Sequence, residues 1–154
     1  MYQDFSKDLE GALFSGLDLF QKYKKIFLVY PHHVKHPPEI RVGFRNFCHD
    51  ANFDYDLIPT VSGHTPGKGE VYIVLEDSDL IELVKKCQKK KLKPGKDVGI
   101  ISYNDTPLKE IVGNGITVIS TDYVRMGQSA ADMIVNKKRE SVKNPFYLLR
   151  RNSL

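Results

Sequence analysis

The sequence predicts an α/β protein in three layers, with a parallel sheet flanked by helices on both faces. Short apolar, β-branched runs alternate along the chain with amphipathic segments, which is typical of this class. The runs Val98–Ile101 and Ile116–Ile119 carry no charge, as expected of central parallel strands that are buried on both faces. Small polar residues follow each run at once, where such sheets carry their ligands.

The first half of the chain is predicted to contain two helices and two strands. Residues 6–25 place apolar side chains at i, i+4 spacing, which indicates an amphipathic helix. A strand at 26–30 leads into a loop rich in proline and histidine. Pro38 is placed to open the second helix, and a strand follows at 56–61.

The second half repeats the alternation of strands and helices. The remaining strands are predicted at residues 71–75, 98–101, 116–119 and 145–149. The helix after the first of these has Asp77 or Ser78 as a possible capping residue. A last helix is predicted at 122–137. A chain of 154 residues favours one domain with a sizeable core.

The composition excludes several classes of protein. A hydrophobic content of 41% and a charged content of 27% are ordinary for a globular protein. The longest apolar run, Ile26–Tyr30, is too short to span a bilayer, and the acidic amino terminus is not a secretory signal. Cys48 and Cys87 lie in apolar helical patterns, so we expect reduced thiols in a cytoplasmic protein that makes no membrane contact.

The net charge of +4 and the pI near 9.0 raise the question of nucleic-acid binding. Much of the excess belongs to one cluster, which consists of Lys85, Lys86, Lys89, Lys90, Lys91, Lys93 and Lys96. No aromatic residue is interleaved there for base stacking, and lysines favour the carboxyl end of a helix. A solvated surface is therefore the favoured interpretation.

Polar residues follow three of the predicted strands. Residues 76–79, 102–105 and 120–122 all carry carboxylate, amide or hydroxyl groups. The carboxyl ends of parallel strands share one edge of the sheet, so we expect these turns to form a site for a polar ligand. Asp77 either caps a helix or contacts that ligand, and the sequence leaves both open.

Three histidines, His32, His33 and His36, lie in the loop after the first strand. A metalloprotease pattern requires a helix with a glutamate between its histidines, and neither is present. We therefore predict no metal site and no cofactor. A loop that touches a polar ligand is the favoured interpretation.

Several segments resemble those of LacI/GalR-type transcription regulators. These segments are Gly43–Phe44, Val71–Asp77, Val98–Asp105, Gly115–Ala131 and Asn144–Leu154, which resemble the family's "R..Gf", "aif..nD", "sVvGfDd", "lTTi.qd...lG..A" and closing "li.R.Ss". The segments KGEVYIVLED and GIISYNDTPLKE are most similar to those of GntR-family regulators that carry a LacI-type sensor domain.

The resemblance implies one lobe of a periplasmic-binding-protein-like (type I) fold, with residues 1–154 forming the carboxyl-terminal lobe. The helix at 122–137 would belong with the partner lobe, and the DNA-binding domain would be absent. The implied function is a sensor in a bacterial transcription regulator, and not an enzyme. Its implied partners are a small-molecule effector (a sugar) and a second copy in a homodimer, with DNA reached only through the missing amino-terminal domain.

The resemblance also implies site residues. Asn104 stands where the family has a ligand-binding aspartate, and an amide can still donate to and accept from a hydroxyl group. Asp77 is the acidic member of "nD", and Thr121 lies at the crossover that faces the cleft. Arg41 lies one residue beyond the position of the family's arginine, which Ile40 occupies here. His33 is a candidate by location alone.

Two other functions remain open. A flavodoxin-like or Rossmann-like enzyme would suit the predicted fold, although no clear nucleophile–base pair or phosphate loop is present. A module that acts only through dimerisation is the other alternative, because a single lobe would expose apolar surface.

Overall fold

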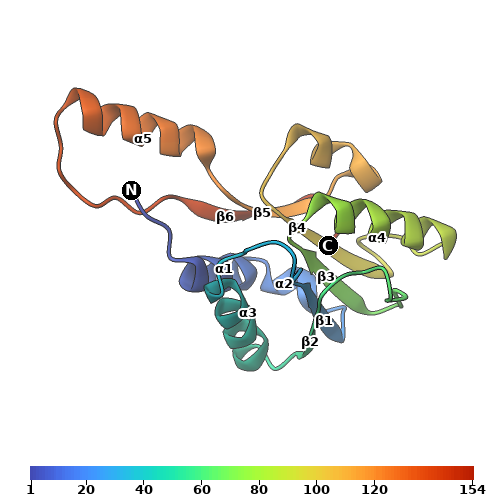
Figure 1. The fold of residues 1–154 in the computed structure, drawn as a ribbon. Coiled ribbons are helices and arrows are strands. Elements are labelled where there is room, and N and C mark those ends of the chain that lie inside the picture. Colours follow the sequence, from blue (N-terminus) through green and yellow to red (C-terminus); the bar gives the residue numbers. More distant parts are fainter.

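A computed structural model describes residues 1–154 and shows a six-stranded sheet in the order β2-β1-β3-β4-β5-β6 (Figure 1). The strands are β1 (Lys25–Val29), β2 (Asp54–Ile58), β3 (Glu70–Val74), β4 (Val98–Tyr103), β5 (Thr117–Thr121) and β6 (Phe146–Leu149). The first five run parallel, and β6 pairs antiparallel with β5. The predicted strands are therefore all confirmed, with shifts of a few residues at their ends.

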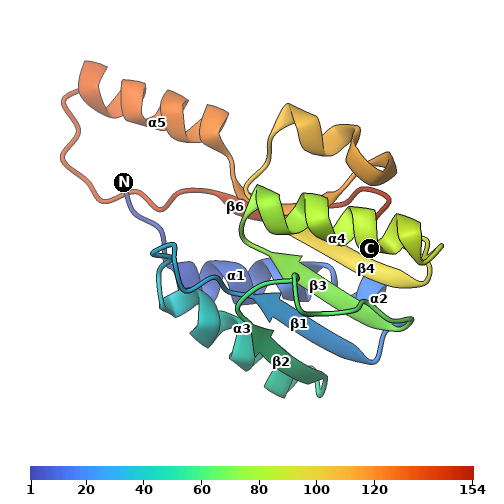
Figure 2. The same ribbon diagram turned by 45° about the vertical axis from the view of Figure 1, so that its right-hand side comes forward.

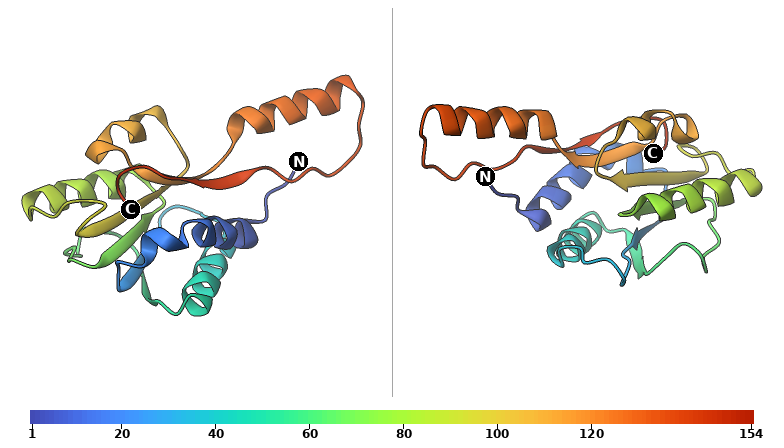
Figure 3. Two further views of the ribbon diagram at one scale, coloured as in Figure 1. Left: turned by 180° about the vertical axis from the view of Figure 1, so that it is seen from behind. Right: turned by 45° about the horizontal axis from the view of Figure 1, so that its top comes forward.

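Helices cover both faces of the sheet, which confirms the predicted three layers (Figures 2 and 3). They are α1 (Phe5–Ser15), α2 (Leu17–Phe20), α3 (Glu39–Asp50), α4 (Asp77–Lys89) and α5 (Tyr123–Val135), with two short 3-10 helices, η1 (Pro107–Glu110) and η2 (Val112–Asn114). The helices α1, α2 and α3 cover one face, and α4 covers the other. No helix is both long enough and apolar enough to cross a membrane.

The core follows from the apolar runs in the sequence. Every residue of β4 and β5 is buried, whereas the first three residues of the edge strand β2 are exposed. On one face α1 packs closely against α3, and Gly43 permits the contact. A Cβ at Gly43 would lie 2.2 Å from the carbonyl oxygen of Ser6, so only glycine fits there.

Two local predictions were wrong. The single helix expected at 6–25 is two helices, because α1 ends at Ser15 and Gly16 separates it from α2. Gly16 packs under Leu148 of β6, where a Cβ would lie 3.1 Å from Leu148 Cδ1. Neither Asp77 nor Ser78 is the cap of α4. Its N-cap is Glu76, which makes no side-chain capping hydrogen bond.

An arm projects from the sheet, formed by α5 and by residues 136–145, which we call the return segment (Figures 1 and 3). No residue of α5 is buried. Val124, Ile134 and Val135 are 73%, 79% and 77% exposed. The amino terminus lies beside the return segment, where the amide of Tyr2 donates to the carbonyl of Val142 at 3.0 Å.

The carboxyl-terminal tail, residues 150–154, lies beside β4. The amide of Ile100 donates to the Ser153 carbonyl at 2.7 Å, and Ser153 Oγ donates to the Ile100 carbonyl at 2.6 Å. The side chain of Leu154 is 5% exposed. It packs so closely over Gly99 that a Cβ there would lie 2.9 Å from Leu154 Cδ1.

Candidate functional site

The carboxyl ends of the parallel strands lie together at one edge of the sheet. From β1 the chain moves to one side to form β2, and then crosses back to form β3 on the other side. Such a reversal of direction leaves a crevice beyond the strand ends where α/β proteins bind ligands. The edge carries two hollows, one on each side of this reversal.

The first, which we call the β3–β4 hollow, lies beyond the ends of those strands and has a volume of about 290 Å³. It is lined by Leu75, Glu76, Asp77, Tyr103, Asn104, Thr106 and Lys109. Asp77 begins α4, where its negative charge is favoured by the helix dipole. Asn104 directly follows β4. Two of the five predicted site residues are thus brought together.

Lys109 is the buried centre of the β3–β4 hollow. Lys109 is only 2% exposed, because η1 folds back over the end of β4. Its Nζ donates to the carbonyls of Tyr103 at 3.0 Å and Asn104 at 2.7 Å. It also lies 3.0 Å from Asp77 Oδ1. A buried ammonium needs such partners, so Lys109 joins the ends of β3 and β4 into one unit.

Asn104 has a φ of +62°, a left-handed conformation that asparagine tolerates better than most residues. Its amide nitrogen donates to the Ile119 carbonyl at 2.8 Å, which fixes the turn. Its side-chain Oδ1 accepts a hydrogen bond of 2.9 Å from the hydroxyl of Tyr123. Tyr123 is the first residue of α5, so the arm touches the hollow directly.

The second, which we call the β1–β2 hollow, is small, at about 60 Å³. It is lined by Tyr30, His32, Arg41, Leu57, Ile58 and Pro59. The guanidinium of Arg41 lies 5.0 Å from the centre of the Tyr30 ring, a cation–π arrangement. Arg41 therefore reaches the carboxyl edge, but not the hollow that holds Asp77 and Asn104.

The loop between β1 and α3, which contains His32, His33 and His36, connects the two hollows. The Tyr30 hydroxyl donates to the His36 carbonyl at 2.7 Å. His36 Nε2 lies 2.8 Å from Glu76 Oε1, with side-chain exposures of 16% and 32%. The loop is thereby held against the β3–β4 hollow by its last histidine.

Thr121 and His33 lie elsewhere. Thr121 is 5% exposed and its Oγ1 donates to Gln3 Oε1 at 3.4 Å, so it faces the amino-terminal segment. His33 is exposed and lines neither hollow. No group of three or more His, Cys, Asp or Glu side chains is placed to hold a metal ion.

Sequence reasoning missed Lys109, His36 as a contact of Glu76, and Tyr123. One signal was available for Lys109, a lone lysine in a short segment just after a strand-end turn.

Burial raises the pKa of the Tyr103 phenol, and the nearby Asp8 carboxylate raises it further. The donors and acceptors of the β3–β4 hollow suit a neutral ligand with several hydroxyl groups.

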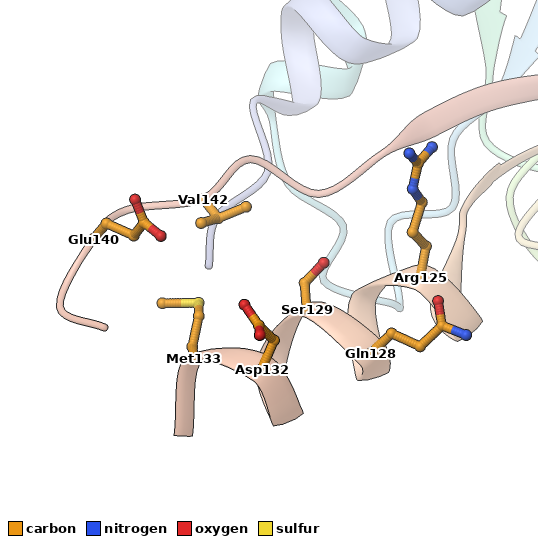
Figure 4. A pocket seen from close by; sticks show the side chains of 7 residues that line it. All are labelled: Arg125, Gln128, Ser129, Asp132, Met133, Glu140 and Val142. Carbon is orange, nitrogen blue, oxygen red and sulfur yellow. The ribbon is translucent and has the colours of Figure 1, made fainter. Parts of the chain in front are cut away.

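A further hollow of about 380 Å³ lies in the arm, between α5 and the return segment (Figure 4). Its lining residues are Arg125, Gln128, Ser129, Asp132, Met133, Glu140 and Val142. Ser129 and Met133 point from α5 toward the return segment (Figure 4). This hollow lies away from the strand ends and shares no lining residue with the β3–β4 hollow.

The fold matches solved structures over nearly its whole length. It is similar to the transcriptional repressor ascG of Escherichia coli, with a TM-score of 0.76, 14% identity, and coverage of 100% of this chain and 63% of that one. It is also similar to a probable maltose operon repressor of Staphylococcus aureus (TM-score 0.73, 20% identity, coverage 98% and 60%). A third match is a LacI family regulator of Enterococcus faecalis with bound ribose (TM-score 0.72, 19% identity, coverage 98% and 61%). No curated protein compared with the chain matches it.

The chain spans about three fifths of the length of these solved structures. The crevice beyond a doubly wound sheet and the matched structures define an α/β fold of the periplasmic-binding-protein-like type. Residues 19–149 match the periplasmic binding protein-like domain family. The chain belongs to this family.

Proposed function

We propose that this chain is the effector-binding lobe of a LacI/GalR-type transcription regulator and that a sugar binds in the β3–β4 hollow. The observation that carries the proposal is the convergence of Asp77 and Asn104 on one hollow at the carboxyl edge. The fold similarity to repressors, and to LacI family transcriptional regulators of which one has bound ribose and another is in complex with lactose, supports it.

The chemistry of the β3–β4 hollow favours a sugar over a charged ligand. Asp77 accepts hydrogen bonds, and the Asn104 amide both donates and accepts them. Lys109 lies 3.0 Å from Asp77 and balances its charge, and Glu76, the other carboxylate of the lining, is engaged by His36 Nε2 at 2.8 Å. Sugar hydroxyls, which donate and accept at once, match these groups.

The arm supports a two-lobed arrangement. A helix such as α5, which exposes Val124, Ile134 and Val135 and has no buried residue, normally has a partner. We propose that α5 and the return segment belong to a second lobe, and that residues 1–154 form the carboxyl-terminal lobe with the DNA-binding domain elsewhere. A sugar that contacts both lobes would favour the closed state and so shift the position of the attached DNA-binding domains.

The finer parts of the proposal rest on the resemblance in sequence. They are a homodimeric, cytoplasmic regulator without enzymatic activity, whose DNA-binding domain is of the GntR type. Thr121, Arg41 and His33 remain predicted ligand contacts. For Thr121 and His33, contact would require that they face a ligand held between two lobes.

The proposal is tested by titrating the isotope-labelled chain with ribose, lactose and maltose while recording amide NMR spectra. Because one lobe supplies only part of the contacts, we expect dissociation constants weaker than about 1 mM. The signals that shift should be those of Asp77, Asn104 and Lys109. Shifts confined to the arm would contradict the site, and a submillimolar constant would contradict the single-lobe part of the proposal.

Two variants make this test specific. Asn104→Gly removes the amide at a position whose φ of +62° suits glycine, and it should abolish the shifts. Asn52→Gly is the matched control, since Asn52 is an exposed asparagine with a φ of +57° at the opposite end of the sheet. This control should leave the titration unchanged.

A further inference from the structure

The amino edge of the sheet, opposite the candidate sugar site, carries most of the lysines of the chain. We call this surface the basic edge. Its lysines are Lys22, Lys24, Lys25, Lys68, Lys85, Lys86, Lys89, Lys90, Lys91, Lys93 and Lys96. They come from the segment that leads into β1, the loop before β3, the carboxyl end of α4 and the loop before β4. Figure 2 shows these segments gathered at one end of the molecule.

Hydrogen bonds bring these segments together. Lys22 Nζ donates to the Gly95 carbonyl at 2.5 Å. The amide of Lys24 donates to the Gly69 carbonyl at 2.7 Å, and the amide of Gly69 donates to the Asp97 carbonyl at 2.8 Å. These bonds join three of the segments, and the carboxyl end of α4 continues directly into the loop before β4, so all four segments meet at the amino edge.

Most of the lysines at the basic edge form no ion pair. Ion pairs within 4.0 Å involve only Lys25, Lys68 and Lys86 among its lysines. The carboxylate of Asp97 is already engaged by the Lys93 amide at 2.9 Å and by Lys68 at 3.5 Å, and the first of these contacts lowers its pKa most. Glu70 accepts from Gly67 and Tyr72. The edge is thus strongly basic beyond the overall net charge of +4.

The basic edge also contains a hollow of about 360 Å³, lined by Thr65, Pro66, Lys86, Lys89 and Lys90 and by no carboxylate. Lys86 shapes it by donating to the carbonyls of Val61, Ser62 and His64, which holds the loop between β2 and β3 in place. Lys89 and Lys90 are exposed beside it. An anionic group with the size of a phosphate fits this hollow, whose lining has three lysines and no carboxylate.

We propose that the basic edge binds the phosphate backbone of duplex nucleic acid without reading its sequence. This inference goes beyond the proposed sugar site and is independent of it. Lysines are point charges that attract phosphates, and such contacts account for sequence-independent binding to DNA. Residues 85–96 offer no aromatic side chain on which unpaired bases could stack, so a duplex fits better than a single strand.

The composition of the edge argues against other partners. Among the large apolar side chains that are exposed, none lies in the segments 65–69 or 85–96. A membrane surface is bound most firmly when apolar side chains insert beside the charges. Protein interfaces are built around aromatic and arginine side chains and are depleted in lysine. A duplex backbone requires neither of these features.

The test measures binding of the full chain to two short, fluorescently labelled duplexes of unrelated sequence, by anisotropy over a range of salt concentrations. We expect equal affinities for the two duplexes and a linear fall of log K with log salt. The triple variant Lys85→Gln, Lys89→Gln, Lys90→Gln should bind more weakly. Its slope should fall by about 0.9 for each of these lysines that contacts a phosphate. If all three contacts are lost, the fall in affinity between 50 and 200 mM salt should be about 40-fold smaller for the variant than for the unaltered chain.

The matched control is the triple variant Lys7→Gln, Lys35→Gln, Lys137→Gln. These exposed lysines make no side-chain hydrogen bond or ion pair, and their removal lowers the net charge by the same amount. The control should keep the slope of the unaltered chain. Equal losses in both triples would overturn the proposal, because net charge alone would then explain binding. Absence of binding at low salt, a preference for one duplex, or binding to vesicles that contain phosphatidylserine but not to DNA would also overturn it.

Discussion

The guanidinium of Arg151 holds the carboxylate of Asp105 with two hydrogen bonds, Nη1 to Oδ1 at 2.9 Å and Nη2 to Oδ2 at 3.0 Å. Arg151 also donates to the Ile116 carbonyl at 3.0 Å. Asp105 is the residue after Asn104, so this pair ties the carboxyl-terminal tail to the edge of the β3–β4 hollow. The two side chains are only 12% and 27% exposed.

Replacing Arg151 should be costly. Arg151→Met leaves the carboxylate of Asp105 largely buried without its partner, and we expect a loss of about 2–4 kcal/mol in the free energy of unfolding, measured by urea denaturation. The matched control is Arg150→Met, because Arg150 forms a similar two-bonded pair with Asp18 at the surface, with exposures of 49% and 62%. That loss should be much smaller. Equal losses would contradict the structural difference between the two pairs.

Lys109 should stabilise the lobe as well as shape its site. Lys109→Met keeps the length of the side chain but leaves the carbonyls of Tyr103 and Asn104 without their donor, and unpaired buried acceptors cost about 1–3 kcal/mol. Urea unfolding should show this loss. Lys35→Met, at an exposed lysine without side-chain contacts, is the control and should change stability little. If Lys109→Met leaves the free energy of unfolding unchanged, water must satisfy these carbonyls in the variant.

The hydrogen bond between Tyr123 and Asn104 should compete with a ligand. A sugar hydroxyl that takes the place of the phenol at Asn104 Oδ1 must displace it, so Tyr123→Phe should raise sugar affinity severalfold, in line with a net hydrogen-bond contribution of about 0.5–1.5 kcal/mol. NMR titration of the variant measures this. Tyr147→Phe serves as the control at another exposed tyrosine, which lies in β6. Weaker binding by Tyr123→Phe would mean that the phenol contacts the sugar itself.

The side chains of α5 should add little to the stability of the lobe. Ile134 is 79% exposed, so Ile134→Ala should change the free energy of unfolding by less than about 0.5 kcal/mol. Ile101→Ala, in the centre of β4 where the side chain is fully buried, should cost about 2–5 kcal/mol. Thermal and urea unfolding measure both. A large loss with Ile134→Ala would show that α5 packs against protein in solution.

The buried thiols should weaken the fold in alkali. Burial raises the pKa of Cys48 from 9.0 to about 12 and that of Cys87 to about 11. The folded protein therefore keeps the protonated thiol while the unfolded chain ionises, so the stabilisation is complete below pH 9 and is lost as the pH rises toward 12. At pH 10 the loss for Cys48 is roughly 1 kcal/mol.

Unfolding free energies at pH 8 and pH 10 test this effect. The Cys48→Ala variant should lose less stability over this interval than the unaltered chain, whatever its stability at pH 8. Parallel curves for the two proteins would contradict it. As a second readout, Ellman's reagent should react with neither cysteine of the folded protein at pH 8, and should react readily with an exposed Ser141→Cys variant.

The sequence was sufficient to predict the sheet, because every strand except β2 contains an uncharged apolar run bounded by polar residues. The prediction of one long helix at 6–25 was wrong for a tertiary reason. Leu148 of the distant strand β6 packs at Gly16, and local periodicity carries no trace of that contact. The prediction of Asp77 or Ser78 as the cap of α4 was wrong because the helix already begins at Asp77. The carboxylate of Asp77 instead pairs with Lys109, 32 residues further along the chain.

The same distinction applies to the candidate site. Asp77 and Asn104 could be predicted to lie at the same edge because each directly follows a parallel strand. Lys109 and Tyr123 reach the site through η1 and α5, whose directions depend on packing rather than on local sequence. Among the histidines, the loop points His36 and not His33 toward Glu76, and a loop with three histidines gives no local reason for that choice.

The tail beside β4 has a consequence for biosynthesis. Ser153 bonds to Ile100 across a separation of 53 residues, and Leu154 covers Gly99. A nascent chain that has just produced β4 therefore lacks the side chains that seal this strand from water. Domains made in this order stay incomplete and open to aggregation until the sealing segment emerges. A ribosome that stalls or terminates before residue 150 would release a chain with an unsealed central strand, which makes it a natural target for chaperones and proteases.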